Sequence, residues 1–97
     1  MADLLNISIV LIVDDELGFL WWLGETFVKA GYQVVPALSC REALSLLKTL
    51  DLGADLVLVD PKLSGASRML RLLKQANPQL MIIFIRYGHR RPPQGWE

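Results

Sequence analysis

Cysteine and histidine are almost absent from this sequence, which contains one of each, Cys40 and His89. One cysteine cannot form an intramolecular disulfide, and the two side chains together are too few to build a structural zinc site. Small folds held together by disulfides or by zinc are therefore excluded. The low cysteine count is typical of a reducing compartment, so we expect the protein to be cytoplasmic.

An excess of one charge and a long apolar run are also lacking. Ten Lys and Arg residues balance ten Asp and Glu residues, which removes any whole-chain argument for binding nucleic acid or an anionic membrane. The longest apolar run, residues 80–85, is far too short to cross a bilayer. The N-terminus has neither the basic region nor the cleavage site of an export signal. We expect no membrane association and no direct binding to nucleic acid.

The sequence does contain enough apolar residues for one hydrophobic core. Its 97 residues suit a single domain, and 53% of them are hydrophobic, which is too many for a disordered chain. We expect one domain over residues 1–97, with its core at 8–86 and a basic, proline-containing tail at 87–97.

Four short apolar runs alternate with three helical patterns. Residues 9–13 are all valine, isoleucine or leucine, which is typical of a strand buried on both faces of a parallel sheet. The other expected elements are strands at 32–37, 55–60 and 80–85, and helices at 16–30, 39–50 and 67–75. The order βαβαβαβ predicts an α/β protein in which right-handed crossovers wind an open parallel sheet with helices on both faces.

Several single residues mark the ends of these elements. Ser39 and Glu42 form the S-x-x-E capping box of the second helix, and Gly53 is expected to end it. Pro36 indicates an edge position for the second strand, because proline has no backbone N–H. Cys40 lies in the first turn of the second helix, where it has either a lowered pKa or the role of an ordinary structural cysteine.

Aspartates end two of the expected strands. Asp14 and Asp15 follow the first strand, and Asp60 ends the third. Ligands of open parallel sheets bind outside the carboxyl ends of the strands. Carboxylates that converge there repel one another, which either raises a pKa or recruits a cation, and an oxygen-only cluster of this kind suits Mg²⁺. The alternative is that Asp14 only caps the first helix and Asp60 only caps the turn that follows it.

Three motifs together resemble the receiver domains of two-component response regulators. They are L-I-V-D-D-E at residues 11–16, A-G-Y at 30–32 and A-D-L-V-L-V-D at 54–60. The resemblance covers roughly residues 8–86. It implies a flavodoxin-like open parallel sheet with strand order 2-1-3-4, and a signalling module that is not a turnover enzyme.

The resemblance also implies roles for individual residues. Asp60 would accept a phosphoryl group from a histidine kinase or a phosphotransfer protein. Asp14, Asp15 and Asp60 would hold Mg²⁺ together with the backbone carbonyl of Lys62. Phosphoryl transfer depends on positioning and on charge neutralisation, which a cation beside three carboxylates supplies.

The sequence departs from the family pattern in three places. Arg86 stands where receivers usually have a serine or threonine, and it either pairs with Asp60 or a phosphoryl group or is a solvated charge at the strand end. The loop P-K-L-S-G at residues 61–65 is short. The family's fifth strand, with its lysine, and its last two helices have no counterpart, so the resemblance implies a receiver domain truncated after the fourth strand.

Such a truncation would expose apolar surface. The strand at 80–85 becomes a sheet edge with unpaired backbone groups, and one flank of the first helix loses its cover. Adjacent tryptophans on that helix cannot both point into one core. We expect a homodimer contact, or a contact with another protein, through Trp21, Trp22, Phe84 and Ile85. The alternative is that one tryptophan is core and the other lies over a neighbouring loop.

Two further functions differ from a phosphoacceptor in kind. A degenerate receiver that is never phosphorylated would work as a protein-interaction or dimerisation module, which Arg86, the short loop and the absent lysine favour. A hydrolase or nucleotide-binding enzyme has no support, because the sequence has no G-x-G-x-x-G, no P-loop and no nucleophile elbow.

Overall fold

The computed structural model describes residues 7–85. They form four strands and three helices in the predicted alternation. The elements are β1 (Ile9–Val13), α1 (Leu17–Lys29), β2 (Gln33–Ala37), α2 (Cys40–Leu50), β3 (Leu56–Val59), α3 (Ala66–Ala76) and β4 (Met81–Phe84). β3 and β4 are each shorter by one residue at both ends than the sequence predicted, and the other boundaries differ by at most one residue.

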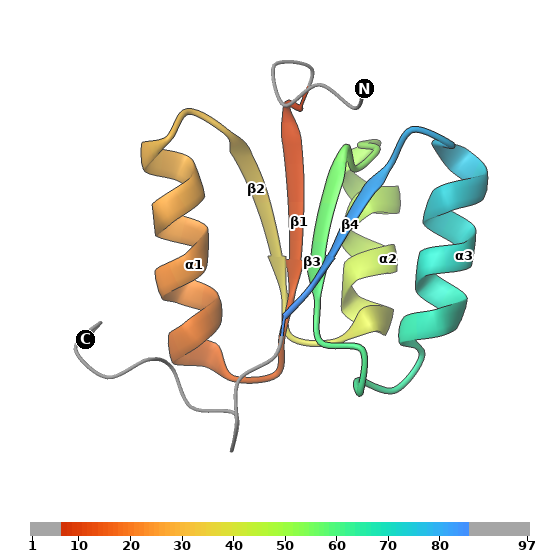
Figure 1. Ribbon diagram of the computed structural model, residues 1–97, viewed down its shortest axis with the longest axis horizontal. Coiled ribbons are helices and arrows are strands. Elements are labelled where there is room, and N and C mark those ends of the chain that lie inside the picture. Colours follow the sequence, from red (N-terminus) through yellow and green to blue (C-terminus); the bar gives the residue numbers. More distant parts are fainter. Residues whose placement is uncertain (1–6, 86–97) are drawn as a thin grey trace.

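The four strands form one parallel sheet in the order β2-β1-β3-β4. α1 covers one face of the sheet, and α2 and α3 cover the other (Figure 1). This arrangement is an incomplete flavodoxin-like α/β fold, and it confirms the fold class and the strand order expected from the sequence. β2 and β4 are the two edge strands within residues 7–85.

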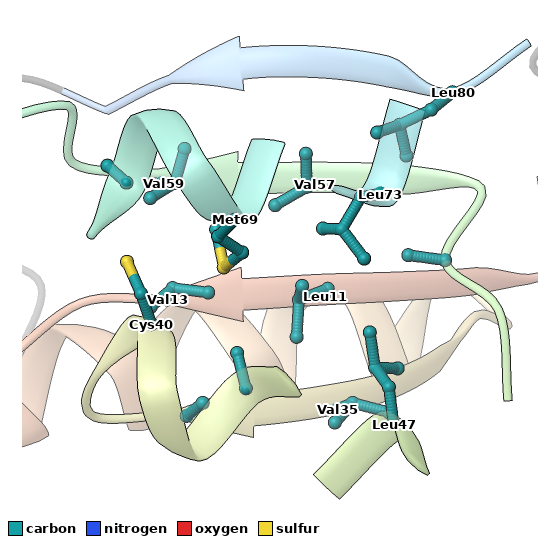
Figure 2. Packing of buried hydrophobic residues seen from close by; sticks show 14 residues of the cluster. Leu11, Val13, Val35, Cys40, Leu47, Val57, Val59, Met69, Leu73 and Leu80 are labelled. Atoms are coloured by element: carbon teal, nitrogen blue, oxygen red, sulfur yellow. The ribbon is translucent and has the colours of Figure 1, made fainter. Parts of the chain in front are cut away.

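The sheet is packed on both faces, and each face has its own apolar cluster. Leu11 and Val57 belong to the larger cluster, against α2 and α3, where Met69 is fully buried between the helices and the sheet (Figure 2). Val10 and Leu56 belong to the smaller cluster, which Leu20 of α1 covers. Alternate residues of one strand therefore serve opposite faces, which explains the unbroken apolar runs of β1 and β3.

Side-chain caps fix where the first two helices begin. The Ser39 hydroxyl accepts a hydrogen bond from the Glu42 N–H at 3.0 Å, and the Glu42 carboxylate accepts one from the Leu38 N–H at 2.7 Å. The predicted capping box is thus present in a variant form. The Glu42 carboxylate bonds the N–H of Leu38, the residue before the N-cap, whereas in the usual capping box it bonds the N–H of the N-cap residue itself. α1 begins after Glu16, whose carboxylate accepts from the Phe19 N–H at 2.8 Å.

The end of α2 differs from the sequence-based prediction. The residue that ends the helix is Asp51, in the left-handed conformation with φ of 54°, and Gly53 lies beyond it. Aspartate tolerates this conformation better than most residues because its short polar side chain interacts locally. The prediction of a glycine at this position was therefore wrong, although the helix ends where expected.

Cys40 is a structural residue of the larger cluster. Its side chain is buried between α2 and the rest of that core, and burial raises the pKa of its thiol. The prediction of an ordinary structural cysteine is confirmed, and the alternative of a lowered pKa at the helix N-terminus is wrong.

No helix within residues 7–85 is long and apolar enough to cross a bilayer.

Met69→Ala should lower the free energy of unfolding by about 2–5 kcal/mol, because it leaves a cavity at a fully buried position. Urea denaturation followed by circular dichroism measures the loss. Leu72→Ala is the matched control on the same helix, since Leu72 is 37% exposed and should cost less than about 1 kcal/mol. Equal losses in the two variants would contradict the packing described here.

Cys40 in the folded protein should react slowly with a thiol reagent such as dithionitrobenzoate at about pH 8. A raised pKa leaves less thiolate at a given pH, and burial limits access to it. The rate should rise sharply when the chain is unfolded in guanidinium. A folded-state rate close to the unfolded-state rate would show that the thiol is accessible.

Candidate functional site

Two buried aspartates lie side by side at the carboxyl edge of the sheet. Asp14 directly follows β1 and Asp60 directly follows β3. These strands are paired in register up to Val13 opposite Val59, and the Asp60 N–H donates to the Val13 carbonyl at 3.4 Å. Asp14 is fully buried and Asp60 is 6% exposed. The sheet therefore brings together Asp14 and Asp60, two of the three predicted acidic residues.

Each of these carboxylates is oriented by a backbone N–H two residues further along the chain. Asp14 Oδ1 accepts from the Glu16 N–H at 2.8 Å, and Asp60 Oδ1 accepts from the Lys62 N–H at 2.8 Å. These bonds stabilise the turns after β1 and β3. The prediction that Asp60 caps the turn after it is confirmed. The prediction that Asp14 caps the first helix is wrong, because the N-cap of α1 is Glu16 and Asp14 bonds within the turn before it. Capping uses one oxygen of each carboxylate, so it does not preclude ligand binding through the same group.

Placing two carboxylates next to each other in a buried position is costly, because like charges repel and water is excluded. Nearby positive charge, such as a bound cation, offsets this cost. Mg²⁺ prefers oxygen ligands such as carboxylates, so the chemical nature of the Asp14 and Asp60 side chains suits this cation.

The third predicted carboxylate occupies a different environment. Asp15 is exposed, whereas Asp14, the residue before it, is buried. Within residues 7–85, no three or more histidine, cysteine, aspartate or glutamate side chains are grouped closely enough to hold a metal ion. The predicted Mg²⁺ site of Asp14, Asp15, Asp60 and the Lys62 carbonyl therefore stays a prediction.

The loop after Asp60 turns sharply into α3. The Leu63 N–H donates to the Asp60 carbonyl at 3.1 Å, and Lys62 is exposed. Pro61 stands directly beside the site and has no N–H to offer a ligand. Arg86, predicted to stand at the end of the fourth strand where receivers usually have a serine or threonine, is outside the described residues.

The two tryptophans of α1 have different surroundings. Trp22 is half-buried, and its ring centroid lies 5.9 Å from that of Phe19. Trp21 is 70% exposed. This divergence agrees with the argument that adjacent tryptophans cannot share one core. Their predicted role in an interface stays a prediction.

The predicted interface residues of β4 also diverge. Phe84 is 56% exposed, whereas Ile85 is half-buried against the cluster under α1. Ile83, which the sequence reasoning did not select, is 45% exposed. The alternation of side chains along a strand could have identified Ile83 and Phe84 as residues of opposite faces, but their exposure depends on which helices cover each face.

The chain was compared with protein-family models, with curated proteins and with solved structures. No family model matches the chain, and no curated protein matches it. Solved structures do match. A response regulator receiver domain protein from Clostridium thermocellum is 25% identical with a TM-score of 0.67, over 80% of this chain and 64% of that one. A CheY-like receiver domain protein from Methanospirillum hungatei JF-1 is 25% identical with a TM-score of 0.69, over 81% and 63%.

A third match is the response regulator protein TrrA from Thermotoga maritima, whose structure was solved in complex with Mg(2+)-BeF. It is 26% identical with a TM-score of 0.66, over 88% of this chain and 75% of that one. The chain spans less than two thirds of the length of the first two proteins. The strand order and these similarities confirm the resemblance found in the sequence: the chain has an incomplete flavodoxin-like fold and is similar to the receiver domains of response regulators.

Proposed function

We propose that the protein is a signalling module that accepts a phosphoryl group on Asp60 from a histidine kinase or a phosphotransfer protein. One observation carries the proposal: Asp60 and Asp14 are buried side by side at the carboxyl edge of β1 and β3, where sheets of this type bind ligands. Two turn hydrogen bonds hold both carboxylates in place before any ligand arrives. A cytoplasmic location and a single domain over residues 1–97 belong to the same proposal.

In the proposed transfer, an oxygen of the Asp60 carboxylate forms a bond to phosphorus while the bond between phosphorus and the imidazole nitrogen of the donor histidine breaks. Mg²⁺ held by Asp14, Asp15, Asp60 and the Lys62 carbonyl would supply the charge neutralisation that lets a phosphoryl group approach these carboxylates. The Lys62 N–H holds Asp60 Oδ1 and so orients the carboxylate. The structure of TrrA with Mg(2+)-BeF supports the choice of this cation.

Arg86 is the proposed contact for the phosphoryl oxygens, in place of the hydroxyl that receivers usually have there. A guanidinium forms charge-assisted hydrogen bonds to a phosphoryl group. Arg86→Ala should therefore weaken the response to a phosphoryl analogue without removing the response to Mg²⁺ alone.

A second function, a protein-interaction or dimerisation module, is favoured by β4. The N–H groups of Met81 and Ile85 point toward β3, where they donate to the Asp55 and Val59 carbonyls. Backbone groups of Ile82 and Phe84 therefore point to the outer side of this edge. Within residues 7–85 no strand lies beyond β4, so the edge can accept a strand from a partner.

The exposed side chains of β4 add to this second candidate. Ile83 and Phe84 present apolar surface on both faces of the strand, which a partner strand and its attached elements would cover. We propose a homodimer through β4 and the α1 flank as the form of this module, with Trp22, Phe84 and Ile85 in the contact. Trp21, the fourth predicted interface residue, instead lines a groove beside β2.

Addition of Mg²⁺ and then beryllofluoride should change the tryptophan fluorescence and raise the melting temperature, because both ligands bind at Asp60 and stabilise the folded state. Asp60→Asn should lose at least about tenfold in apparent Mg²⁺ affinity and should not respond to beryllofluoride. Asp51→Asn, a change of the same kind at the exposed end of α2, should behave like the wild type. A folded wild-type protein with no response would sink the phosphoacceptor proposal and leave the interaction module.

Phe84→Lys should shift the protein toward monomer in sedimentation equilibrium, since it places a charge in the proposed contact. We expect at least about a tenfold weaker dimer, corresponding to about 1.4 kcal/mol. Leu72→Lys, on an exposed position of α3, is the control and should leave the assembly state unchanged. A monomeric wild-type protein, or a dimer that tolerates Phe84→Lys, would contradict a contact through β4.

A further inference from the structure

An apolar groove of about 310 Å³ lies between α1 and the edge strand β2. Three exposed side chains of α1 form one wall, Leu17, Trp21 and Val28, with exposed fractions of 64%, 70% and 53%. Pro36 and Leu38 line the opposite wall. β2 and β4 are at opposite edges of the sheet (Figure 1). This groove is therefore a different surface from the β4 edge.

The edge of β2 cannot readily accept another strand. The Gln33 N–H donates to the Ser8 carbonyl at 3.0 Å, so residues 33, 35 and 37 face β1 and residues 34, 36 and 38 face outward. Pro36 has no N–H, and the Leu38 N–H is already bonded to the Glu42 carboxylate at 2.7 Å. Only Val34 remains as an outward donor. A ligand of this groove must therefore bind through its side chains.

The charges of the groove have one sign. Glu25 of α1 and Glu42 of α2 are the only charged residues among those that line it. If two copies of the chain met symmetrically through this groove, the same acidic residues would face each other, and like-charge contacts are unfavourable. The acidic rim therefore disfavours a second copy and favours a partner with basic residues beside an apolar surface.

The dimensions of the groove suit a helix. Leu17 and Val28 lie about 16 Å apart along the α1 axis at 1.5 Å per residue, which matches about three turns of a second helix packed alongside. At Gly24, a Cβ would approach Val34 Cγ1 to 3.7 Å. The backbone of α1 therefore lies close to β2 at this point, and Gly24 and Val34 form the floor of the groove. Exposed apolar side chains then rise on either side of that floor.

We propose that this groove binds an amphipathic helix of a partner protein, with its apolar face against Trp21 and Leu38 and with flanking Lys or Arg residues beside Glu25 and Glu42. Helices that present apolar residues at i, i+3 or i+4 and i+7 are the ligands that such grooves hold. Trp21 is the central anchor, because its large, exposed ring gains the most buried area on binding.

Isothermal titration calorimetry with a synthetic 14-residue helical peptide of leucine and lysine tests the proposal. The peptide carries leucines at helical spacing and lysines on its flanks, and its matched partner has glutamates in place of the lysines. The basic peptide should bind saturably with a 1:1 stoichiometry and should shift the tryptophan emission to shorter wavelength. The acidic peptide should bind at least about tenfold more weakly.

Variants assign the binding to the groove. Trp21→Ala should weaken binding of the basic peptide at least about tenfold, and Glu25→Gln should weaken it several-fold and reduce its dependence on salt. Phe84→Ala, which removes a similarly exposed aromatic ring at the opposite edge, should bind normally. Asp60→Asn should also bind normally, so that failure of phosphoryl transfer and failure of this proposal can be told apart.

Three outcomes would overturn the proposal. One is equal affinity for the basic and acidic peptides. Another is a Trp21→Ala variant that binds as tightly as the wild type. The last is self-association that depends on Trp21 in the absence of peptide binding, which would make a second copy of the chain the occupant of the groove.

Discussion

The burial of β1 on both faces is the constraint on which the rest of the structure depends. β1 pairs with β2 on one side and with β3 on the other, and helices cover it from both directions. Its side chains from Val10 to Val13 are fully buried. The first polar residue after it must therefore lie at the boundary of the core, and that residue is Asp14. The same pairing fixes Asp60 beside it, at the end of β3.

The acidic site is thus a direct consequence of strand register. A shift of β3 by one residue would move Asp60 to the other face of the sheet and would disrupt the side-chain packing of both apolar clusters. The apolar residues of β1 and β3 stabilise the one register in which the two aspartates meet. Core packing therefore offsets the electrostatic cost of holding two carboxylates together.

The two edges of the sheet differ in what they can bind. At the β2 edge, Pro36 has no N–H to donate, and the outward N–H of Leu38 is bonded to the Glu42 carboxylate. That edge is therefore protected against pairing with another strand. β4 has no such protection among the described residues, and it carries two exposed apolar side chains. A partner at β4 can therefore use backbone hydrogen bonds, whereas a partner at β2 has to use side chains.

The sequence by itself determined the order of the elements, because each strand and helix has a distinct apolar period and because Ser39, Glu42 and Pro36 mark local boundaries. It also determined which aspartates end strands, and the motifs around Asp14 and Asp60 indicated the receiver resemblance. Gly53 was misjudged as a helix end because the left-handed residue, Asp51, depends on how α2 meets the following turn.

Only the tertiary structure decided the environment of each residue. Asp14 is buried and Asp15 is exposed although they are neighbours in the sequence. Cys40 has a raised pKa because α2 turns it into the core. Trp21 lines a groove while Trp22 packs beside Phe19. Local patterns specify elements, but exposure depends on which surfaces those elements cover when they pack.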